Sequence, residues 1–483
     1  MKIPTTLRYA ILAGAIVAGP VSLRADESAL LDLLVRKHLL TEKEAAQVQD
    51  ESARIEAGKD ASEIKLSNAV SEMRIYGDIR ERYQYDELQN QFYAPVFTSY
   101  YPYKYKTQNP AGNQESRWRF RLRLDADFKL GEQWFGGVEL STNYSSTDSN
   151  QTYGYEFSKD AIYISKAFLG YRPTEAITFE IGKFSNPFYT TDLVWDPDLN
   201  PEGLYEQLEF HKLFAGGHSG KPLPWELTLV AGQLVYSDNP EGGRGTNPIG
   251  STDPGATISD YHTDGYVFET QLIASYNASW AKFTVAPAWF VENAAALRYP
   301  NTPVYALNSR KLSELLLPGD VSFTIGGVKT KLYWDASYNF EGKGRFKDVY
   351  YLGGLTYDYT ANNIIPITHG WQDNLAWLAG LQIGQNAKAG DFSFLADWRQ
   401  TGISSVDPNL HDSDFAFGYL NTQGYRLALA YNLTDFAVFQ ITWSQAWNFR
   451  KNLIGGEAAP YYGTGVANAN SAKVLQVDLN VKF

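Results

Sequence analysis

Two segments of this sequence carry arginines whose spacing could do chemistry. MRIYGDIRERYQYD and RWRFRLRLDADFKL each place arginines at one parity, two or a multiple of two residues apart. Residues two apart in an extended strand share a face, and guanidinium groups bind carboxylates or phosphates in a forked geometry. The two segments therefore predict one basic wall across neighbouring strands. Its members are Arg74, Arg80, Arg82, Arg117, Arg119, Arg121 and Arg123.

The basic wall must face water. Arginine facing lipid at mid-depth costs ~2–4 kcal/mol, and the opposite parity is apolar, with Trp118, Phe120 and Leu122. We expect the arginines to line the lumen of a barrel. Two interpretations stay open, a basic wall that narrows a pore or a charge ladder neutralised by lumenal acids. The candidate neutralising acids are Asp78, Asp125, Asp127 and Glu139.

A second group of charged residues lies in the segment GKFSNPFYTTDLVWDPDLNPEGL, residues 182–204. Its carboxylates, which we predict to be constriction acids, are Asp192, Asp196, Asp198 and Glu202. The segment links the fifth and sixth predicted strands, as a third outer loop would. If it folds inward, its acids would face the arginines and set a transverse field that orients dipolar solutes. The alternative is an ordinary surface loop rich in Asp, Asn and Pro.

Motifs for metal binding or catalysis are incomplete in this chain. Residues 196–200 begin like a calcium loop, but Pro201 and Gln207 stand where glycine and glutamate are required. Residues 217–222 resemble a phosphate loop without its first glycine and its Ser/Thr. The six histidines show no ligand spacing. We predict no enzymatic activity, no catalytic residues, no cofactor and no metal site.

The first 25 residues have the pattern of a secretory signal peptide, with Lys2 and Arg8 before an apolar stretch and a cut after Ala25. The ten apolar residues are too few to span ~30 Å of hydrocarbon. The chain has no cysteine, so no disulfide framework holds it. Without Lys2, Arg8 and Arg24, the chain keeps 39 of its 42 basic residues against 54 acidic ones, so acidic residues are in excess. This acidic chain is a poor candidate for binding nucleic acid.

From residue 73 the sequence alternates with the period of β-strands. Runs of ten residues at ~3.3 Å each, tilted ~45°, match the ~25 Å apolar band of an outer-membrane barrel. Aromatics near strand ends, such as Trp134 and Tyr144, predict interfacial girdles. Pro287 lies within one predicted strand. The strands are expected near residues 73–85, 116–130, 133–145, 160–172, 177–184, 204–215, 225–236, 265–276, 281–292, 328–340, 349–360, 374–386, 391–401, 422–432, 436–449 and 472–483.

Short and long links alternate between these strands, as periplasmic turns and outer loops do. The predicted fold class is an all-β transmembrane barrel of about 16 antiparallel strands, which leaves no free edge. A short N-terminal periplasmic helical segment precedes it, with a capping box at residues 41–44. That segment is either a solvated helix pair or a stalk that supports a trimer. The predicted domains are 1–25, signal peptide; 26–72, helical segment and linker; and 73–483, barrel.

Several segments resemble a known family. ALLDLLVRKHLLTEKEAAQVQDE, MRIYGDIRERYQYD, residues 182–204 and the terminal Phe483 are similar to the putative outer-membrane porins. The resemblance implies a bacterial outer membrane with its lipid, a homotrimer, and insertion by the barrel-assembly machinery, which reads a C-terminal aromatic strand ending at Phe483. The helical N-terminus and the arginine-lined barrel are also similar, in chemistry rather than in motif, to the phosphate-selective porins.

Passive diffusion of small hydrophilic solutes, through a water-filled barrel narrowed by the third outer loop, is the leading functional interpretation. A channel selective for anions or sugars is an alternative, and a track of lumenal aromatics would favour sugars. A barrel that anchors a periplasmic cell-wall tether is another. A hydrolase would need a Ser–His pair near the outer rim, and the strand parities place none there.

Overall fold

The structure is a computed structural model. It describes residues 67–96, 104–107, 113–142, 149–154, 156–214, 223–237, 265–293, 312–342, 357–358, 363–364, 373–407, 410–449 and 466–483. The predicted signal peptide lies outside the described residues, and so does the helical segment with its stalk and tether interpretations. A compact unit from Ala69 to Phe483 holds every element named below.

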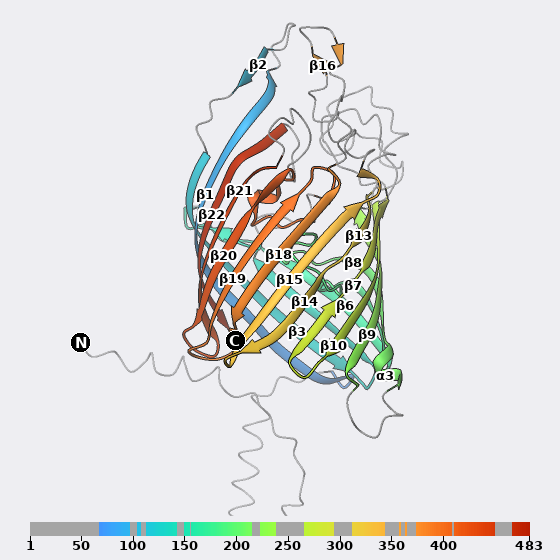
Figure 1. The fold of residues 1–483 in the computed structure, drawn as a ribbon. Coiled ribbons are helices and arrows are strands. Elements are labelled where there is room, and N and C mark those ends of the chain that lie inside the picture. The colour runs from blue at the N-terminus through green and yellow to red at the C-terminus, as the bar shows by residue number, and fades with distance from the viewer. Residues whose placement is uncertain are drawn as a thin grey trace, which may run out of the picture. The chain divides into compact units, whose positions relative to one another are not determined.

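One antiparallel sheet that closes on itself makes up this unit (Figure 1). Its strands are β1 (Val70–Val96), β2 (Lys104–Thr107), β3 (Asn113–Leu130), β4 (Trp134–Thr142), β5 (Gln151–Thr152), β6 (Ile162–Thr174), β7 (Ile177–Lys183), β8 (Glu202–Glu209), β9 (Trp225–Ser237), β10 (Gly265–Asn277), β11 (Ala281–Val285), β12 (Ala288–Asn293), β13 (Leu312–Leu316), β14 (Gly319–Ile325), β15 (Val328–Asn339), β18 (Leu375–Gly384), β19 (Phe392–Thr401), β20 (Thr422–Asn432), β21 (Ala437–Asn448) and β22 (Val466–Lys482).

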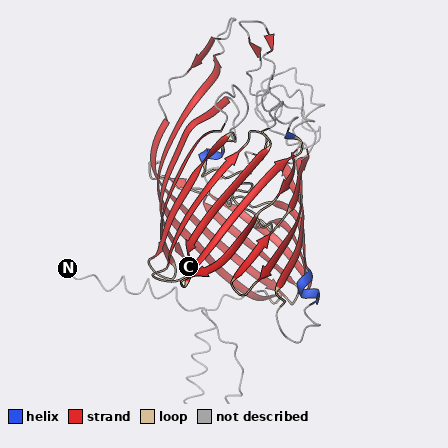
Figure 2. Ribbon diagram, in the orientation of Figure 1, coloured by secondary structure: helices blue, strands red, loops and turns tan. Residues whose placement is uncertain are grey.

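Helical structure is minor in the described part of the chain (Figure 2). It includes α3 (Phe210–Phe214) and the 3-10 turn η6 (Ala416–Gly418). Within the described ranges, no helix is long and apolar enough to cross a membrane. A separate small sheet pairs β16 (Tyr357–Asp358) with β17 (Asn363–Ile364).

Sixteen strands form the wall, as predicted. β2 and β5 are short pieces beside β1 and β3. β11 and β12 both pair with β10, and β13 and β14 both pair with β15, so each pair is one wall strand interrupted near Pro287 or Pro318. The two breaks lie side by side, because Ala286 N donates to Pro318 O at 2.9 Å. β1 pairs with both β3 and β22, which closes the barrel.

One of the sixteen predicted strands is wrong. The wall strand is 312–325, formed by β13 and β14, and not 349–360, where Tyr357 and Asp358 pair with β17 outside the wall. The short link expected between the predicted strands 328–340 and 349–360 is wrong with it, since the short turn lies before β15, at Gly326–Gly327. A Leu-Pro-Gly break at 317–319 made the missed segment look like a loop. The matching break at Pro287 in the neighbouring strand lets the sheet accept it.

Exposure alternates along the wall strands in the reverse of the soluble pattern. On β1, Ile75 is 57% exposed and Ile79 43%, whereas Arg82 on the other face is 3% exposed. On β3, Trp118 is 57% exposed and Arg121 only 4%. A barrel that presents apolar side chains outward and polar ones inward is suited to a lipid surround. The unit is a transmembrane β-barrel.

Candidate functional site

Loop 3, residues 184–201 between β7 and β8, folds into the barrel. Its Asp192 carboxylate lies 3.2 Å from the Nη2 atom of Arg399 on β19 and also forms an ion pair with Arg426 on β20. β7 and β8 are the fifth and sixth wall strands, and β19 and β20 are the thirteenth and fourteenth. Loop 3 therefore reaches across the interior of the barrel.

Hydrogen bonds tie loop 3 to the inner wall along its length. Thr191 Oγ1 donates to Asp335 Oδ2 of β15 at 2.7 Å. Trp195 Nε1 donates to Glu269 Oε2 of β10 at 3.3 Å. Both acceptors are buried wall carboxylates, which are costly to leave without donors. These contacts fix the depth at which the loop crosses the lumen.

An apolar core fills the space between loop 3 and one side of the wall. The loop contributes Phe184, Leu193, Val194 and Trp195, all at most 5% exposed. Facing them are inward residues of β9, β10, β12, β13 and β18, where a pore lumen would ordinarily be polar. They include Val230, Leu234, Val267, Phe290, Leu312 and Leu378. This side of the barrel is packed shut.

A second loop folds inward to meet loop 3. Loop 7, residues 402–421 between β19 and β20, is described over 402–407 and 410–421. Its His411 Nδ1 lies 2.7 Å from Leu193 O. Its Ser413 donates to Asp196 Oδ2 through the main-chain N at 3.0 Å and through Oγ at 2.7 Å. The two loops brace each other inside the barrel.

Five charged residues form a buried cluster where both loops meet the wall. Arg399 lies 3.3 Å from Asp397 and 2.9 Å from Asp412 of loop 7. Arg426 lies 2.7 Å from Asp397, and both arginines pair with Asp192. Burial by itself would raise the pKa of Asp192, but the two guanidinium groups outweigh it and hold that pKa below its usual range.

The arginines of the predicted basic wall, called the arginine row below, lie on the inner face of β1 and β3. Most of these arginine side chains are buried. Arg80, Arg82, Arg119 and Arg121 are at most 9% exposed. Arg82 Nε lies 2.7 Å from Asp478 of β22, a partner that sequence could not reveal across the closure. Four arginines of the predicted wall are thus buried side chains rather than an open surface.

Each arginine of the row has a side-chain partner, and two of them share Asp78. Arg117 and Arg123 keep 25% and 30% of their side chains exposed. Arg117 lies 2.5 Å from Asp86, and Arg123 lies 2.7 Å from Asp78, which Arg121 shares at 2.8 Å. Arg80 Nη2 donates to Asn150 Oδ1 at 2.5 Å, and Arg119 Nη1 donates to Gln84 Oε1 at 3.2 Å. Exposed Arg74 stacks on the Tyr76 ring.

The four predicted constriction acids separate in the structure. Asp198 lies 3.6 Å from Arg121 Nη1 and so faces the arginine row. Asp196 bonds loop 7, and Asp192 pairs with Arg399 and Arg426 instead. Glu202 lies on β8, 60% exposed, and pairs with Lys183 at 2.7 Å. Sequence reasoning missed Arg399 and the role of Arg426, although Arg426 alternates with outward Leu427 on β20.

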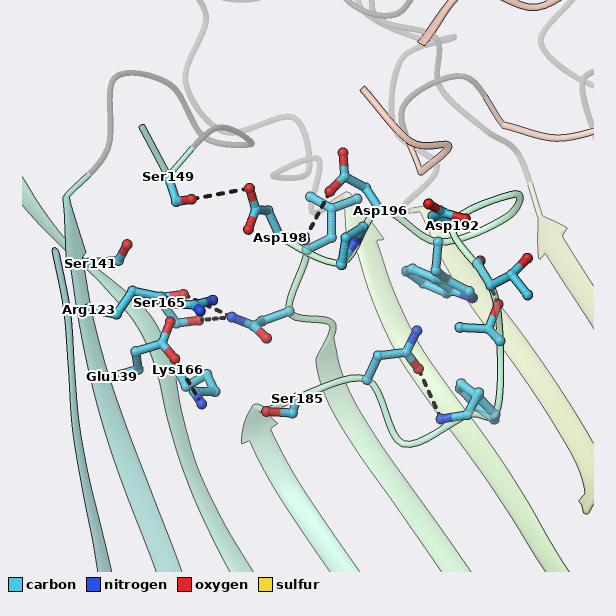
Figure 3. A pocket seen from close by; sticks show the side chains of 18 residues that line it. Arg123, Glu139, Ser141, Ser149, Ser165, Lys166, Ser185, Asp192, Asp196 and Asp198 are labelled. Atoms are coloured by element: carbon cyan, nitrogen blue, oxygen red, sulfur yellow. Dashed lines mark hydrogen bonds and ion pairs between the residues drawn. The ribbon is translucent and has the colours of Figure 1, made fainter. Parts of the chain in front are cut away.

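A cavity of about 340 Å³ separates loop 3 from β3, β4 and β6 (Figure 3). Lys166 Nζ lies on the wall side, 2.9 Å from both Asp125 and Glu139. Hydroxyl groups of Ser141, Ser149 and Ser185 also line the space. The charged lining residues are Arg123, Glu139 and Lys166 from the wall and Asp192, Asp196 and Asp198 from loop 3. Charged and hydroxyl groups from both the wall and loop 3 therefore line this cavity.

The C-terminal Phe483 completes the wall at the end of the short turns. Its N donates to Gly77 O, and Gly77 N donates back to Phe483 O, each at 3.0 Å. A Cβ atom at Gly77 would lie 2.2 Å from Arg123 O and 2.8 Å from the Phe483 ring. Only glycine leaves room for this closure.

Residues 35–219 match the family described as "Putative porin". Among curated proteins, no sequence matches.

Solved structures similar to the chain include the outer membrane channel DcaP of Acinetobacter baumannii, at 11% identity and TM-score 0.41, over 87% of this chain and 99% of that one. OmpF of Salmonella typhi, in complex with daunomycin, is similar at 10% identity and TM-score 0.44, over 87% and 100%. OprB of Pseudomonas putida is similar at 10% identity and TM-score 0.43, over 84% and 94%. The chain resembles the putative porins in the sequence of residues 35–219 and is, in its fold, a sixteen-stranded transmembrane β-barrel.

Proposed function

We propose that this barrel is a diffusion channel for small hydrophilic solutes, narrowed by loop 3. The observation that carries the proposal is the polar cavity between loop 3 and the wall of β3, β4 and β6. The opposite side of the lumen is closed by the apolar core, so solutes would pass on the side of the cavity. A lumen lined by charged and hydroxyl groups suits hydrated solutes.

Two features of the cavity favour general diffusion over a sugar- or anion-selective channel. Its lining aromatics, Phe188 and Trp195, are 6% and 5% exposed, so they offer no track for sugar rings. The arginines that would bind anions are mostly buried and hydrogen-bonded internally. Neither the aromatic nor the arginine side chains therefore give one class of solute a continuous path.

The remaining parts of the proposal rest on the sequence pattern and the family resemblance. We place the short turns and the segment 26–72 on the periplasmic side, after removal of a signal peptide at residues 1–25, with residues 73–483 as the barrel. The resemblance supports a homotrimer. It also supports recognition of the last strand, ending at Phe483, by the barrel-assembly machinery.

Swelling of liposomes that contain the purified full-length protein tests the channel directly. Neutral sugars of increasing size are added outside, and the swelling rate is followed. We expect rates that fall steeply with sugar size, because the passage is narrowed by a fixed loop. Liposomes that swell no faster than protein-free ones would contradict the proposal.

A further inference from the structure

The charges around the cavity do not balance, and their excess is acidic. Two cationic side chains line it, Arg123 and Lys166, against four carboxylates. Those carboxylates are Glu139, Asp192, Asp196 and Asp198. Each lining cation also has carboxylate partners within 3 Å. The basic character that the sequence suggests is thus offset at the cavity itself.

Among the charged wall side chains that line the cavity and their ion-pair partners, cations and acids match one for one. Asp78 is shared by Arg121 and Arg123, at 2.8 and 2.7 Å. Lys166 lies between Asp125 and Glu139. The three cations and three carboxylates of this group neutralise one another, so its field inside the cavity is weak.

On the loop 3 side, acids are in excess. Asp196 accepts hydrogen bonds from Ser413 and from the main-chain N of Asp198, which are neutral donors. Asp198 accepts from Ser149 Oγ at 3.1 Å, and its nearest guanidinium, of Arg121, is 3.6 Å away and already engaged with Asp78. Asp198 keeps 22% of its side chain exposed. Negative potential therefore extends from loop 3 into the passage.

We infer that the passage is cation-preferring, so that solutes bearing an ammonium or other positive charge cross it faster than anions of equal size. The arginine row points the other way in the sequence, but most of its members are buried or paired, whereas Asp198 lines the cavity with 22% of its side chain exposed and Asp196 lies beside it. Charged side chains at a constriction set which ions enter. The inference rests on the proposed diffusion function and names the solute class that the same passage favours.

Reversal potentials of the full-length protein in planar bilayers, under a KCl gradient, test the inference. We expect the ratio of K⁺ permeability to Cl⁻ permeability to be at least about 2. Asp198→Asn should lower the ratio toward unity and Asp198→Glu should preserve it. Glu72→Gln, which removes an equal charge from an exposed pair with Lys129 at the short-turn end, should leave the ratio unchanged.

Uptake of charged sugars of equal size gives the same contrast with organic solutes. Liposomes containing the protein should admit glucosamine faster than glucuronate. A conducting channel with a permeability ratio at or below unity, or with faster glucuronate uptake, would overturn the inference and leave the diffusion function standing. A protein that does not conduct at all would overturn both.

Discussion

Asp192 in loop 3 forms an ion pair with Arg399 on β19, and the two residues belong to opposite sides of the barrel wall. The side chain of Arg399 has no exposed surface, and its guanidinium lies 4.4 Å from the centre of the Phe415 ring in loop 7. One wall side chain thus holds both inward loops. Loop 3 is held in a fixed position across the lumen, because Asp192 binds the opposite side of the wall.

Arg399→Ala should loosen both loops. Removing one partner of a buried ion pair leaves uncompensated charge and costs about 3–5 kcal/mol. We expect a lower urea midpoint of unfolding and noisier single-channel current. Arg74→Ala, which removes an exposed arginine, is the matched control and should change neither. Equal midpoints for Arg399→Ala and wild type would show that the cluster does not hold the loops.

Trp195→Ala should widen the passage. Trp195 packs edge-on against Phe290 with ring centres 6.3 Å apart and donates to Glu269. Truncating a buried aromatic costs about 3–5 kcal/mol, and loop 3 would lose an anchor. Swelling assays should then show uptake of larger sugars. Trp280→Ala, at a 65% exposed position, should leave the size limit unchanged, and an unaltered limit in Trp195→Ala would refute the anchoring role.

Cation preference should rise with pH through about 6. Burial, and next the charge of Asp198, raise the pKa of Asp196 to about 6, so this carboxyl is neutral below that pH and charged above it. Burial lowers the pKa of the nearby His411 to about 4, so it stays neutral in this window. Two other groups of loop 7 lie near Asp196. Ser413 donates a hydrogen bond to it, and the buried Asp412 forms an ion pair with Arg399.

The reversal potential measured from about pH 5 to pH 8 checks this titration. The direction of the change follows from the raised pKa of Asp196. Its carboxyl keeps its proton up to about pH 6, so the negative charge that favours cations appears only above that pH. Asp196→Asn should remove the pH step. A step of undiminished size in that variant would assign it to another group.

Gly77→Ala should impair closure of the barrel. Its Cβ would lie 2.2 Å from Arg123 O, and backbone cannot yield as a flexible side chain does. Overpacking of this kind costs about 1–3 kcal/mol. We expect slower folding into detergent and a lower thermal transition on gels. Ile75→Ala on the same strand, a lipid-facing position, is the control, and a wild-type transition for Gly77→Ala would contradict the seam geometry.

The wall was predictable from sequence because alternation and link length are local properties. The interrupted strand at 312–325 was missed because Pro318 breaks the local pattern, and only the neighbouring break at Pro287 makes it acceptable. Inward parity was readable for Arg121 and Arg426. Asp78, which pairs with Arg121, was among the predicted neutralising acids. The pairs of Arg426 with Asp192 and of Arg82 with Asp478 were not readable, because loop folding and barrel closure form them rather than sequence spacing.

Thiol labelling of the passage tests the central claim, that solutes cross between loop 3 and the wall. The chain has no cysteine, so Ser185→Cys, an exposed and uncharged cavity position, and Ser71→Cys at the short-turn end each give a single target. Bilayer current through Ser185→Cys channels should fall in discrete steps when a bulky thiol reagent is added, and current through Ser71→Cys channels should not. Fully labelled Ser185→Cys channels that conduct like unlabelled ones would contradict the account.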